Sequence, residues 1–319
     1  MPEVVEVCLT AQWLDHELKN TTMSDIKILS GRYVKNKMKG LDNFKKSNNY
    51  KIKKIDSKGK FLWFELVDKN GKFLYILNKF GLTGVWTFEE KDHSGVKFII
   101  KDGNKTRNLF FTDQMHYGTI ELTTDIKRLN SELSKLGDDF LKTPFTNSEF
   151  YYRIDDYIKR GGDTIIKTRA DKEIVVVLMD QTMKNGIGSG LGNYLSVSAL
   201  YHAKISPYTT MGNLYKNKPL ITKLANSIRY IVKLTYLTTT IGYFEYLDEG
   251  MSSFLIKLRK DISKNIKHPF NFHPNVKIKA GDQFKFDVYM QKEDPYGNPV
   301  MKSKIIPGRT TYWVPAVQK

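Results

Sequence analysis

Apolar residues recur with the period of a helix at the start of the chain. Between residues 3 and 20 they stand at Val7, Ala11, Leu14 and Leu18, a spacing that places them on one helix face. The chain is therefore predicted to open with an amphipathic helix.

The pattern changes to that of short strands over residues 51–111. Runs of β-branched and aromatic residues alternate there with turns of Gly, Asn and Asp, which is typical of antiparallel sheets. Asp102-Gly103 indicates a tight hairpin between the last two runs. We predict a β-sandwich or barrel with the first helix packed against it. The runs read YKIKKID, KFLWFELVD, KFLYILNKF, TGVWTFEE, GVKFIIKDG and RNLFFTD.

From about residue 125 the pattern becomes helical and stays so to about residue 262. Residues 125–141 and 143–160 predict two helices, the second with a capping candidate at Asn147. A longer helix is predicted around an apolar face made by Leu224, Ile228 and Ile231.

Two further segments have the character of strands. EIVVVLMD, over residues 173–180, could form a buried strand. The last part of the chain carries the short β-like runs QFKFDVYMQ, NPVMKSKII and TTYWVP, with a tight turn at residues 307–309.

These patterns predict an α+β fold of two domains. An N-terminal β-sandwich flanked by helices is expected over residues 1–140, followed by a linker over 141–150. A helical domain is expected over 151–270, and a β-hairpin over 275–319.

Composition narrows the function classes. The single cysteine, Cys8, excludes an intrachain disulfide framework and a zinc site built from several cysteines. The zinc-binding pattern HExxH does not occur either. We therefore expect neither a metal nor a cofactor. No apolar run approaches the roughly 20 residues that span a bilayer, and a secretory pattern is missing, so we expect an intracellular protein without a membrane partner. The net charge of +17 points to a polyanion such as nucleic acid.

A glycine-rich segment, NGIGSGLGNYL over residues 185–195, leaves two interpretations open. A dinucleotide cradle needs an acidic residue about 20 positions past the glycines, but residues 181–244 contain no Asp or Glu. A nucleic-acid phosphate suits the segment better, because a helix starting near Leu191 would point free N–H groups at it and Asn193 would add a donor. The alternative is an ordinary tight connection between two helices.

The longer motif around these glycines, LMDQTMKNGIGSGLGNYLSVSALYHAKISP, resembles the helix–two-turn–helix of the formamidopyrimidine-DNA glycosylase and endonuclease VIII family. Other motifs are similar to that family in chain order, so the resemblance covers nearly the whole chain. It implies that the helical domain contains a helix–two-turn–helix and that the C-terminal hairpin corresponds to the family's zinc finger. The other motifs are MPEVVEV, DSKGKFLWFEL, NKFGLTGVW, FTDQMHYGTIEL and VYMQKEDPYGNPVMKSKIIPGRTTYWVPAVQK.

The resemblance implies roles for individual residues. Removal of Met1 would free the amine of Pro2, which would be the nucleophile, and Glu3 would act as a general acid and base. An α-amino group has a pKa near 8, so an appreciable fraction is unprotonated at neutral pH. A secondary amine can form an iminium with a sugar aldehyde carbon. The resemblance also implies contacts to DNA from Lys60, Asn193 and Arg309, a catalytic contribution from Lys60, and a place near the base pocket for Glu6.

The sequence departs from the family at several positions, including Val4, Val5 and a lengthened glycine turn, and two of the departures bear on function. The C-terminal hairpin has no cysteine, so we expect a zincless finger held together by packing. The residues that would fill the space left by an extruded nucleotide include no arginine, which predicts weak discrimination of the opposite base and a preference for oxidised pyrimidines. The packing residues expected in the finger are Tyr289, Tyr312 and Trp313, and the void-filling ones are Leu82, Met115 and Tyr117.

We therefore predict a bifunctional DNA glycosylase and AP lyase of base excision repair. It would remove oxidised bases through a Schiff base at Pro2, followed by β,δ-elimination. Damaged duplex DNA is the expected partner, with single-stranded DNA as a further substrate, and a monomer is the expected state. A catalytically silent homologue that binds DNA or lesions is the alternative.

Overall fold

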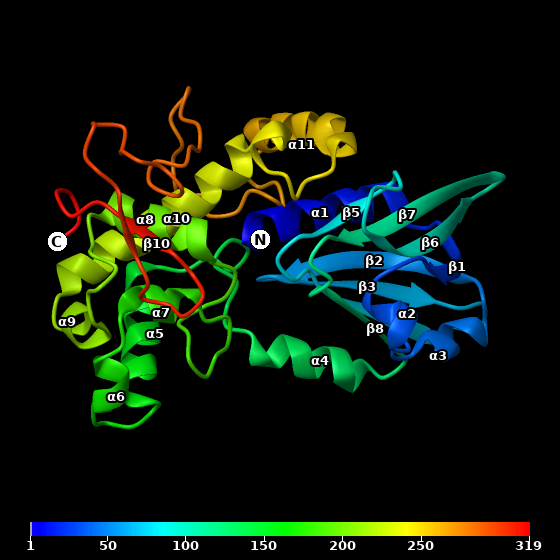
Figure 1. Cartoon of the computed structure of the whole chain (residues 1–319), viewed down its shortest axis with the longest axis horizontal. Helices are drawn as coiled ribbons and strands as arrows, with labels where there is room; N and C mark the ends of the chain where they lie inside the picture. The colour runs from blue at the N-terminus through cyan, green and yellow to red at the C-terminus, as the bar shows by residue number, and fades with distance from the viewer. Residues whose placement is uncertain (1) are drawn as a thin grey trace. The chain divides into compact units, whose positions relative to one another are not determined.

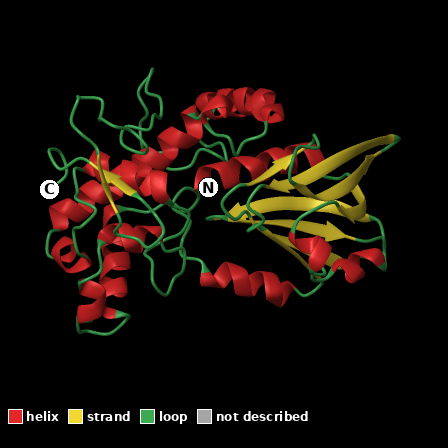
Figure 2. Ribbon diagram, viewed as in Figure 1, coloured by secondary structure: helices red, strands yellow, loops and turns green. Residues whose placement is uncertain are grey.

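The computed structural model describes residues 2–319, which form two compact units (Figures 1 and 2). The first unit comprises the chain up to Ser134 together with Thr240–Lys264, and the second comprises Lys135–Thr239 and Asn265–Lys319. Strands dominate the first unit and helices the second. The α+β class predicted from the sequence is confirmed.

An eight-stranded antiparallel sheet forms the body of the first unit, in the order β5-β7-β6-β1-β2-β3-β4-β8. All six predicted strands are present, and the hairpin at Gly103 is closed by the pairing of Asp102 with Lys105. Two strands outside the predicted runs, β1 and β8, complete the sheet. The strands are β1 Thr22–Ile28, β2 Tyr50–Lys58, β3 Phe61–Val67, β4 Phe73–Lys79, β5 Gly84–Thr87, β6 Ser94–Asp102, β7 Lys105–Asp113 and β8 Thr119–Thr123.

The sheet folds around a buried aromatic core centred on Trp86 of β5. The Trp86 ring lies 5.2 Å from that of Phe64 in β3 and 5.3 Å from that of Phe98 in β6. Its Nε1–H donates to Oδ1 of Asn78 in β4 at 3.0 Å. Because β5 begins the strand order while β3 and β4 lie near its end, these contacts join the two halves of the sheet across the core. This arrangement is the sandwich that the sequence predicts.

Helix α1 (Val4–Leu18) lies along the sheet against β2 and β3 (Figure 1). The four residues of its predicted apolar face are all buried. Oδ1 of Asp15 accepts a hydrogen bond from the backbone N–H of Ile55 at 2.7 Å and fixes the helix to β2. Three other helices of this unit are α2 Arg32–Lys35, α3 Leu41–Lys45 and α4 Ile126–Lys135.

Helix α11 (Ser252–Lys264) also belongs to the first unit, whereas the sequence places residues 151–270 in one helical domain. The difference arises because the segment that starts at Thr240 returns to the first unit. There the ring of Phe254 lies 5.4 Å from that of His16 on α1. Short 3₁₀ turns at Ile241–Tyr243 and Glu249–Met251 precede α11.

The second unit is built around helix α10 (Lys218–Thr238), which packs against α8 and α5. The predicted apolar face of α10 is confirmed, since Leu224, Ile228 and Ile231 are buried. Among the helices of residues 2–319, none has the length and apolar character that a bilayer crossing requires. The remaining elements are α5 Asn147–Lys159, α6 Lys167–Ala170, α7 Ile174–Met179, α8 Asn193–Ala203, α9 Met211–Tyr215, β9 Met301–Ser303 and β10 Thr311–Trp313.

Several local expectations were wrong. Residues 174–179 form helix α7 rather than a strand, because their apolar run is buried against α8 and no strand within residues 2–319 pairs with it. Helix α5 is capped by Thr146 in a capping box with Glu149, so Asn147 is its first helical residue. Helix α4 ends at Lys135 instead of continuing to residue 141. QFKFDVYMQ forms no strand.

The expected linker, residues 141–150, is packed into the second unit rather than exposed. Leu141 is fully buried and Phe145 is 5 % exposed. The guanidinium of Arg229 stacks on the Phe145 ring and donates to its carbonyl oxygen at 2.7 Å. The division between the units therefore falls earlier, at Ser134.

A buried histidine predicts acid sensitivity of the second unit. His273 is 3 % exposed, and its Nε2 lies 2.8 Å from the carbonyl oxygen of Phe140, which can only accept, so Nε2 carries a proton. Burial lowers the pKa of His273 to about 4. As the pH falls from 6.5 towards 4, the unfolded chain binds a proton that the folded chain refuses, and stability should fall by about 3 kcal/mol.

Urea unfolding at pH 7 and pH 4.5 measures this loss. His273→Gln keeps a donor for Phe140 but does not titrate, so it should reduce the loss between the two pH values. His16→Gln, at an exposed histidine, should leave the loss unchanged. An equal loss in His273→Gln and in the unsubstituted protein would contradict the assignment.

Candidate functional site

The start of the chain places two carboxyl groups at the N-terminus of α1. Pro2 is buried directly ahead of the helix, and Glu3 is its N-cap, 1 % exposed. Oε2 of Glu6, also 1 % exposed, accepts from the backbone N–H of Glu3 at 3.0 Å as part of a capping box between the two residues. The positive end of the helix dipole favours carboxylates at this position. Pro2 and Glu3 are thus held in a fixed, water-poor setting, while Met1 lies outside the described residues.

Lys60 lies at the same end of the sheet as this helix terminus. It is half-buried and follows Gly59, whose φ of +56° makes the tight turn between β2 and β3. From the hydrogen bond between Asp15 and Ile55, α1 runs back twelve residues to Glu3, or about 18 Å at 1.5 Å per residue. In the opposite chain direction β2 runs forward three residues to its end at Lys58, or about 10 Å, and Lys60 follows in the turn. The structure therefore brings Glu3 and Lys60 to the same end of the α1–β2 pair.

A second cluster gathers the loops that carry the three predicted void-filling residues. Leu82 lies in the turn between β4 and β5, and Met115 and Tyr117 lie between β7 and β8, with exposed fractions of 47 % and 60 %. The turns touch each other, since a Cβ on Gly81 would come within 2.5 Å of the backbone nitrogen of Gly118. The turn that carries Leu82 therefore contacts the loop that carries the exposed Met115 and Tyr117.

One residue that the sequence did not single out, Asp113, ties these two loops together. Its buried carboxylate accepts from the hydroxyl of Thr83 in one loop and from the backbone N–H of Gly118 in the other. The Thr83 hydroxyl oxygen in turn accepts from the N–H of Met115 at 3.0 Å. Asp113 stands inside the quoted motif FTDQMHYGTIEL, but no spacing rule marks it, because its partners are set by the fold.

In the second unit, Asn193 is the first residue of α8 and joins the glycine turn to the C-terminal hairpin. Its Nδ2 donates to the carbonyl oxygen of Thr310 at 2.9 Å. Arg309 precedes that residue, in a turn closed by its own backbone N–H to Ile306 at 3.1 Å. The tight turn predicted at residues 307–309 is present, and the structure brings Asn193 and Arg309 next to each other along this hairpin.

The glycine turn itself is organised by Gln181, a residue that no pattern in the sequence marks. Its side-chain Nε2 donates to the carbonyl oxygen of Leu191 at 2.8 Å, and its Oε1 accepts from the N–H of Gly190. Small residues are required because a Cβ on Gly188 would lie 2.4 Å from the Phe140 ring. The glycines therefore allow close packing on Phe140, and they present the start of α8 at the hairpin.

The C-terminal hairpin is held by a different core from the one predicted. Val288, Val300 and Val314 pack with Val197 and Tyr201 of α8, while Tyr289 and Tyr312 lie against this cluster. Trp313, expected in the core, instead contacts Tyr208 edge-on and donates to Oγ of Ser303 at 3.0 Å. The valines hold the hairpin in place because they pack on the apolar surface that α8 supplies.

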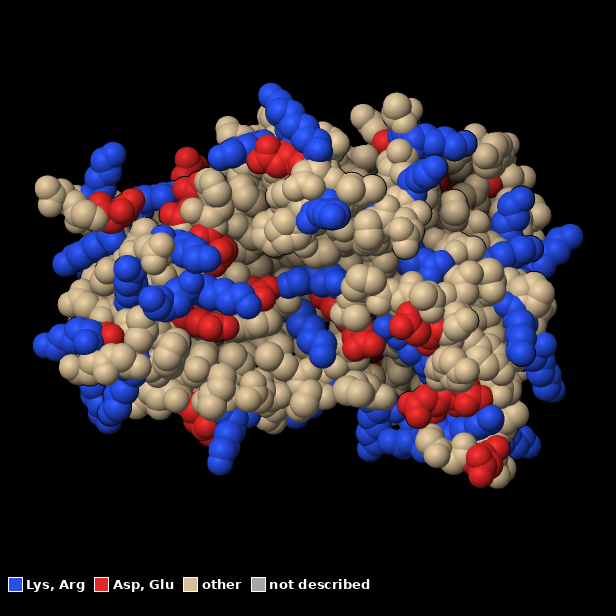
Figure 3. Space-filling view, turned by 180° about the vertical axis from the view of Figure 1, so that it is seen from behind, with Lys and Arg blue, Asp and Glu red and all other residues tan. Residues whose placement is uncertain are grey.

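Lysine and arginine side chains are distributed widely over the protein. Figure 3 shows them projecting from all parts of one face, with acidic side chains between them. Such a distribution attracts a polyanion without specifying a sequence.

Comparison with known proteins identifies the family. The N-terminal domain of the formamidopyrimidine-DNA glycosylases matches residues 1–120, and the C-terminal domain of the same proteins matches residues 274–319. The chain belongs to this family. The N-terminal match contains Pro2, Glu3 and Lys60, and the C-terminal match contains Arg309.

Curated and solved members of the family agree with this membership. The formamidopyrimidine-DNA glycosylase of Prochlorococcus marinus (strain MIT 9301) is 24 % identical over the full length of both chains. That of Ligilactobacillus salivarius is 28 % identical over 67 % of this chain and 70 % of its own. The fold is similar to that of the MutM (Fpg) protein of Thermus thermophilus, with a TM-score of 0.68, 18 % identity and coverage of 99 % and 98 % of the two chains.

A second solved relative was crystallised with damaged DNA. The Lactococcus lactis Fpg protein in a complex with DNA containing Fapy-dG aligns over 100 % of both chains, with a TM-score of 0.66 and 20 % identity. Members of the formamidopyrimidine-DNA glycosylase family are DNA repair enzymes, and this protein shares their fold from end to end.

Proposed function

We propose that the protein is a bifunctional DNA glycosylase and AP lyase of base excision repair with Pro2 as its nucleophile. The observation that carries the proposal is the burial of Pro2 and Glu3 together at the N-terminus of α1. Free α-amino groups have pKa values near 8, so an appreciable fraction is unprotonated and nucleophilic at neutral pH. Removal of Met1 is a condition of this chemistry.

The reaction begins when the Pro2 nitrogen attacks C1′ of the extruded nucleotide. The bond from C1′ to the base breaks, and the base leaves with that electron pair and takes up a proton. The Pro2 nitrogen gives its own proton to Glu3, and Glu3 passes that proton to the ring oxygen O4′ as the bond between O4′ and C1′ opens, which leaves an iminium between Pro2 and C1′. The iminium acidifies C2′–H, so loss of that proton expels the 3′ phosphate, and a second elimination expels the 5′ phosphate.

DNA binding in this proposal divides between two regions. Lys60 contacts a phosphate beside the lesion, and Asn193 and Arg309 contact the backbone from the second unit. The hydrogen bond from Asn193 to Thr310 supports a shared role for the glycine turn and the hairpin, because one segment holds the other in place. Glu6 lies close enough to Glu3 to border the base pocket.

We further propose a preference for oxidised pyrimidines. Leu82, Met115 and Tyr117 offer apolar and aromatic surface to the vacated space but no arginine to bind the opposite base. Such side chains stack and exclude water without reading hydrogen-bond patterns. Activity on a lesion should therefore depend little on the base opposite, and single-stranded substrates should also be cleaved.

Borohydride trapping tests the activity, the nucleophile and the substrate together. Oligonucleotides carrying an oxidised pyrimidine, 8-oxoguanine or an abasic site are incubated with the protein and sodium borohydride, in duplex and single-stranded form. We expect a covalent complex, most abundant with the pyrimidine lesion and the abasic site. Lesion-specific binding without a covalent complex on any of them would instead establish a catalytically silent DNA-binding homologue.

The Asp113 contacts lead to a prediction about duplex substrates. Asp113→Asn keeps the size of the side chain, but it cannot accept from both Thr83 and Gly118, so the two loops should lose about 1–2 kcal/mol of mutual support. We expect kcat/KM on duplex lesions to fall roughly tenfold. Single-stranded lesions should be affected less, because no paired strand leaves a space to fill.

Asp125→Asn provides the matched control. Asp125 also accepts a backbone N–H, from Lys127 at 2.9 Å, but it lies in an exposed turn before α4. Asp125→Asn should leave kcat/KM unchanged on both duplex and single-stranded lesions. An equal loss on duplex and single-stranded DNA in Asp113→Asn would show that Asp113 supports the fold in general and not these loops.

A further inference from the structure

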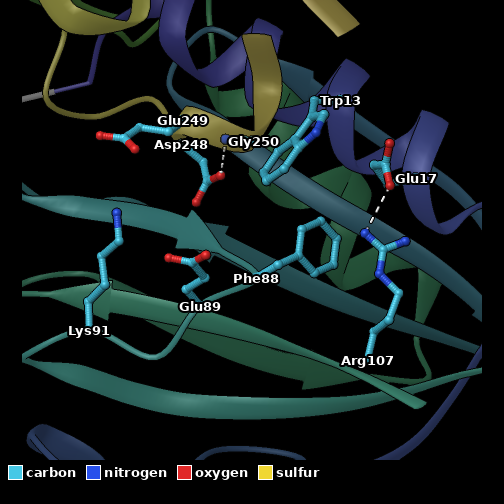
Figure 4. A pocket seen from close by; sticks show the side chains of 9 residues that line it. All are labelled: Trp13, Glu17, Phe88, Glu89, Lys91, Arg107, Asp248, Glu249 and Gly250. Atoms are coloured by element: carbon cyan, nitrogen blue, oxygen red, sulfur yellow. Dashed lines mark hydrogen bonds and ion pairs between the residues drawn. The ribbon is translucent and has the colours of Figure 1, made fainter. Parts of the chain in front are cut away.

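A pocket of about 290 Å³ lies wholly within the first unit, away from Pro2. Its walls come from α1, from the connection between β5 and β6, from β7 and from the turn before α11 (Figure 4). Trp13, the α1 residue of the pocket nearest the N-terminus, stands about 15 Å along the helix from Glu3. The volume is near the lower end of the ~300–1,000 Å³ typical of small-molecule sites, so the ligand should be small.

One wall of the pocket is aromatic, and the guanidinium of Arg107, which also lines the pocket, lies over it. The rings of Trp13 and Phe88 meet edge to face at 5.1 Å. The guanidinium of Arg107 sits 4.0 Å from the centre of the Phe88 ring and is paired with Glu17 at 2.9 Å. In Figure 4 the Phe88 ring lies between Arg107 on one side and the carboxylates of Glu89 and Asp248 on the other. The charge of Arg107 is thus matched by Glu17 and leaves the other carboxylates unneutralised.

The opposite wall carries an excess of negative charge around one buried carboxylate. Asp248 is 8 % exposed, and its Oδ1 accepts from the backbone N–H of Gly250 at 2.7 Å, while the carboxylate points into the pocket (Figure 4). Glu89 and Glu249 stand exposed beside it. Within residues 2–319 none of these three carboxylates forms an ion pair, although Lys91 also lines the pocket.

The surroundings of Asp248 disfavour its charged form. Burial raises the pKa of its carboxyl; the hydrogen bond from Gly250 and the charge of Lys91 oppose this rise, and the charges of Glu89 and Glu249 add to it. A buried carboxylate without a countercharge is costly even when one oxygen accepts a hydrogen bond, so a cation placed against the second oxygen of Asp248 would stabilise its charged form.

We propose that this pocket binds a primary alkylammonium group, with the ammonium against Asp248 and the aliphatic stem along Phe88 and Trp13. Anions are disfavoured by the three carboxylates, and a neutral ligand would leave Asp248 unpaired. An ammonium gains from both the carboxylate and the neighbouring aromatic rings. The rest of the protein carries a large positive charge, which repels amines elsewhere and makes this site selective. The inference does not depend on glycosylase activity.

Calorimetric titration of the full chain with 1-pentylamine tests the proposal. We expect saturable binding with a dissociation constant on the order of 1 mM, and none with 1-pentanol, which has the same stem and no charge. Asp248→Asn keeps the acceptor for Gly250 but removes the charge, and it should weaken binding at least about tenfold. Equal binding of pentanol, or no saturable binding of pentylamine, would overturn the proposal.

Asp92, in the connection between β5 and β6 that also carries Glu89, provides a control with the same change of charge. Asp92 is exposed and does not line the pocket, so Asp92→Asn should bind pentylamine as the unsubstituted protein does. If Asp248→Asn fails to fold, the double variant Glu89→Gln, Glu249→Gln removes two rim charges and should weaken binding in the same direction. Unchanged affinity in whichever of these pocket variants folds would overturn the proposal.

Two sources of an alkylammonium group are distinguished by two further probes. One is the free diamine 1,5-diaminopentane, and the other is the peptide acetyl-Gly-Lys-Gly-amide, compared with the same peptide carrying norleucine. Tighter binding of the lysine peptide than of the diamine would identify a lysine side chain of a protein partner. Binding of the diamine alone would identify a free amine, and binding of neither would contradict the proposal.

Discussion

Pro2→Gly is expected to lower formation of the borohydride-trapped complex by at least about three orders of magnitude, within the range seen when an enzyme loses its nucleophile. A secondary amine gives an iminium that is always charged, whereas the imine of a primary amine must first be protonated to withdraw electrons from C2′. Glycine also lacks the ring by which Pro2 is buried ahead of α1. The measurement is single-turnover trapping on an abasic duplex.

A second variant tests the same nitrogen without removing proline. If one additional residue is retained ahead of Pro2, its nitrogen becomes an amide and loses its nucleophilicity, so trapping should vanish. Both proteins should still bind lesion-containing DNA with affinity close to that of the unsubstituted protein, because the proposed phosphate contacts of Lys60, Asn193 and Arg309 remain. Undiminished trapping in both would show that another amine, such as a lysine, is the nucleophile.

Trp86→Ala is expected to destabilise the first unit by about 3–5 kcal/mol, which is a large part of the roughly 5–15 kcal/mol that stabilises a typical domain. Trp86 is 1 % exposed, and its ring contacts Phe64, Phe98 and Phe111 on three different strands. Its loss would leave a cavity at the point where the two halves of the sheet meet. Urea unfolding followed by circular dichroism measures the effect.

Two substitutions separate the parts of this effect. Trp86→Phe keeps most of the packing but leaves Oδ1 of the buried Asn78 without its donor, at a cost of about 1–3 kcal/mol. Phe73→Ala removes an aromatic ring that is 43 % exposed on β4, and it should cost no more than about 1 kcal/mol. If Trp86→Ala proved as mild as Phe73→Ala, Trp86 would not be the centre of the core.

Local patterns predicted the elements whose neighbours are close in sequence. The hairpin at Gly103 and the apolar faces of α1 and α10 follow from periods of two and 3.6 residues, and the structure confirms them. Strands β1 and β8 have weaker patterns and were missed, because their places in the sheet depend on partners far along the chain. Helix α7 was mistaken for a strand for a different reason: a short apolar run suits a buried strand as well as a buried helix.

The sequence by itself determined the chemistry available to this protein. The proline at position 2, the glutamate after it, the glycine turn at Asn193 and the basic charge can all be read from the sequence, and together they point to the family that the comparisons confirm. The absence of cysteine from the hairpin is equally plain in the sequence, since it depends on residue type alone.

Only the tertiary structure decided how these groups are supported. Asp113 and Gln181 join segments through hydrogen bonds whose partners are fixed by the fold, and the hairpin rests on valines that meet α8 across about a hundred residues of chain. The acidic pocket around Asp248 likewise exists because the segment after α10 returns to the first unit. Contacts between distant segments leave no period or spacing in a sequence, because they depend on where the chain folds back on itself.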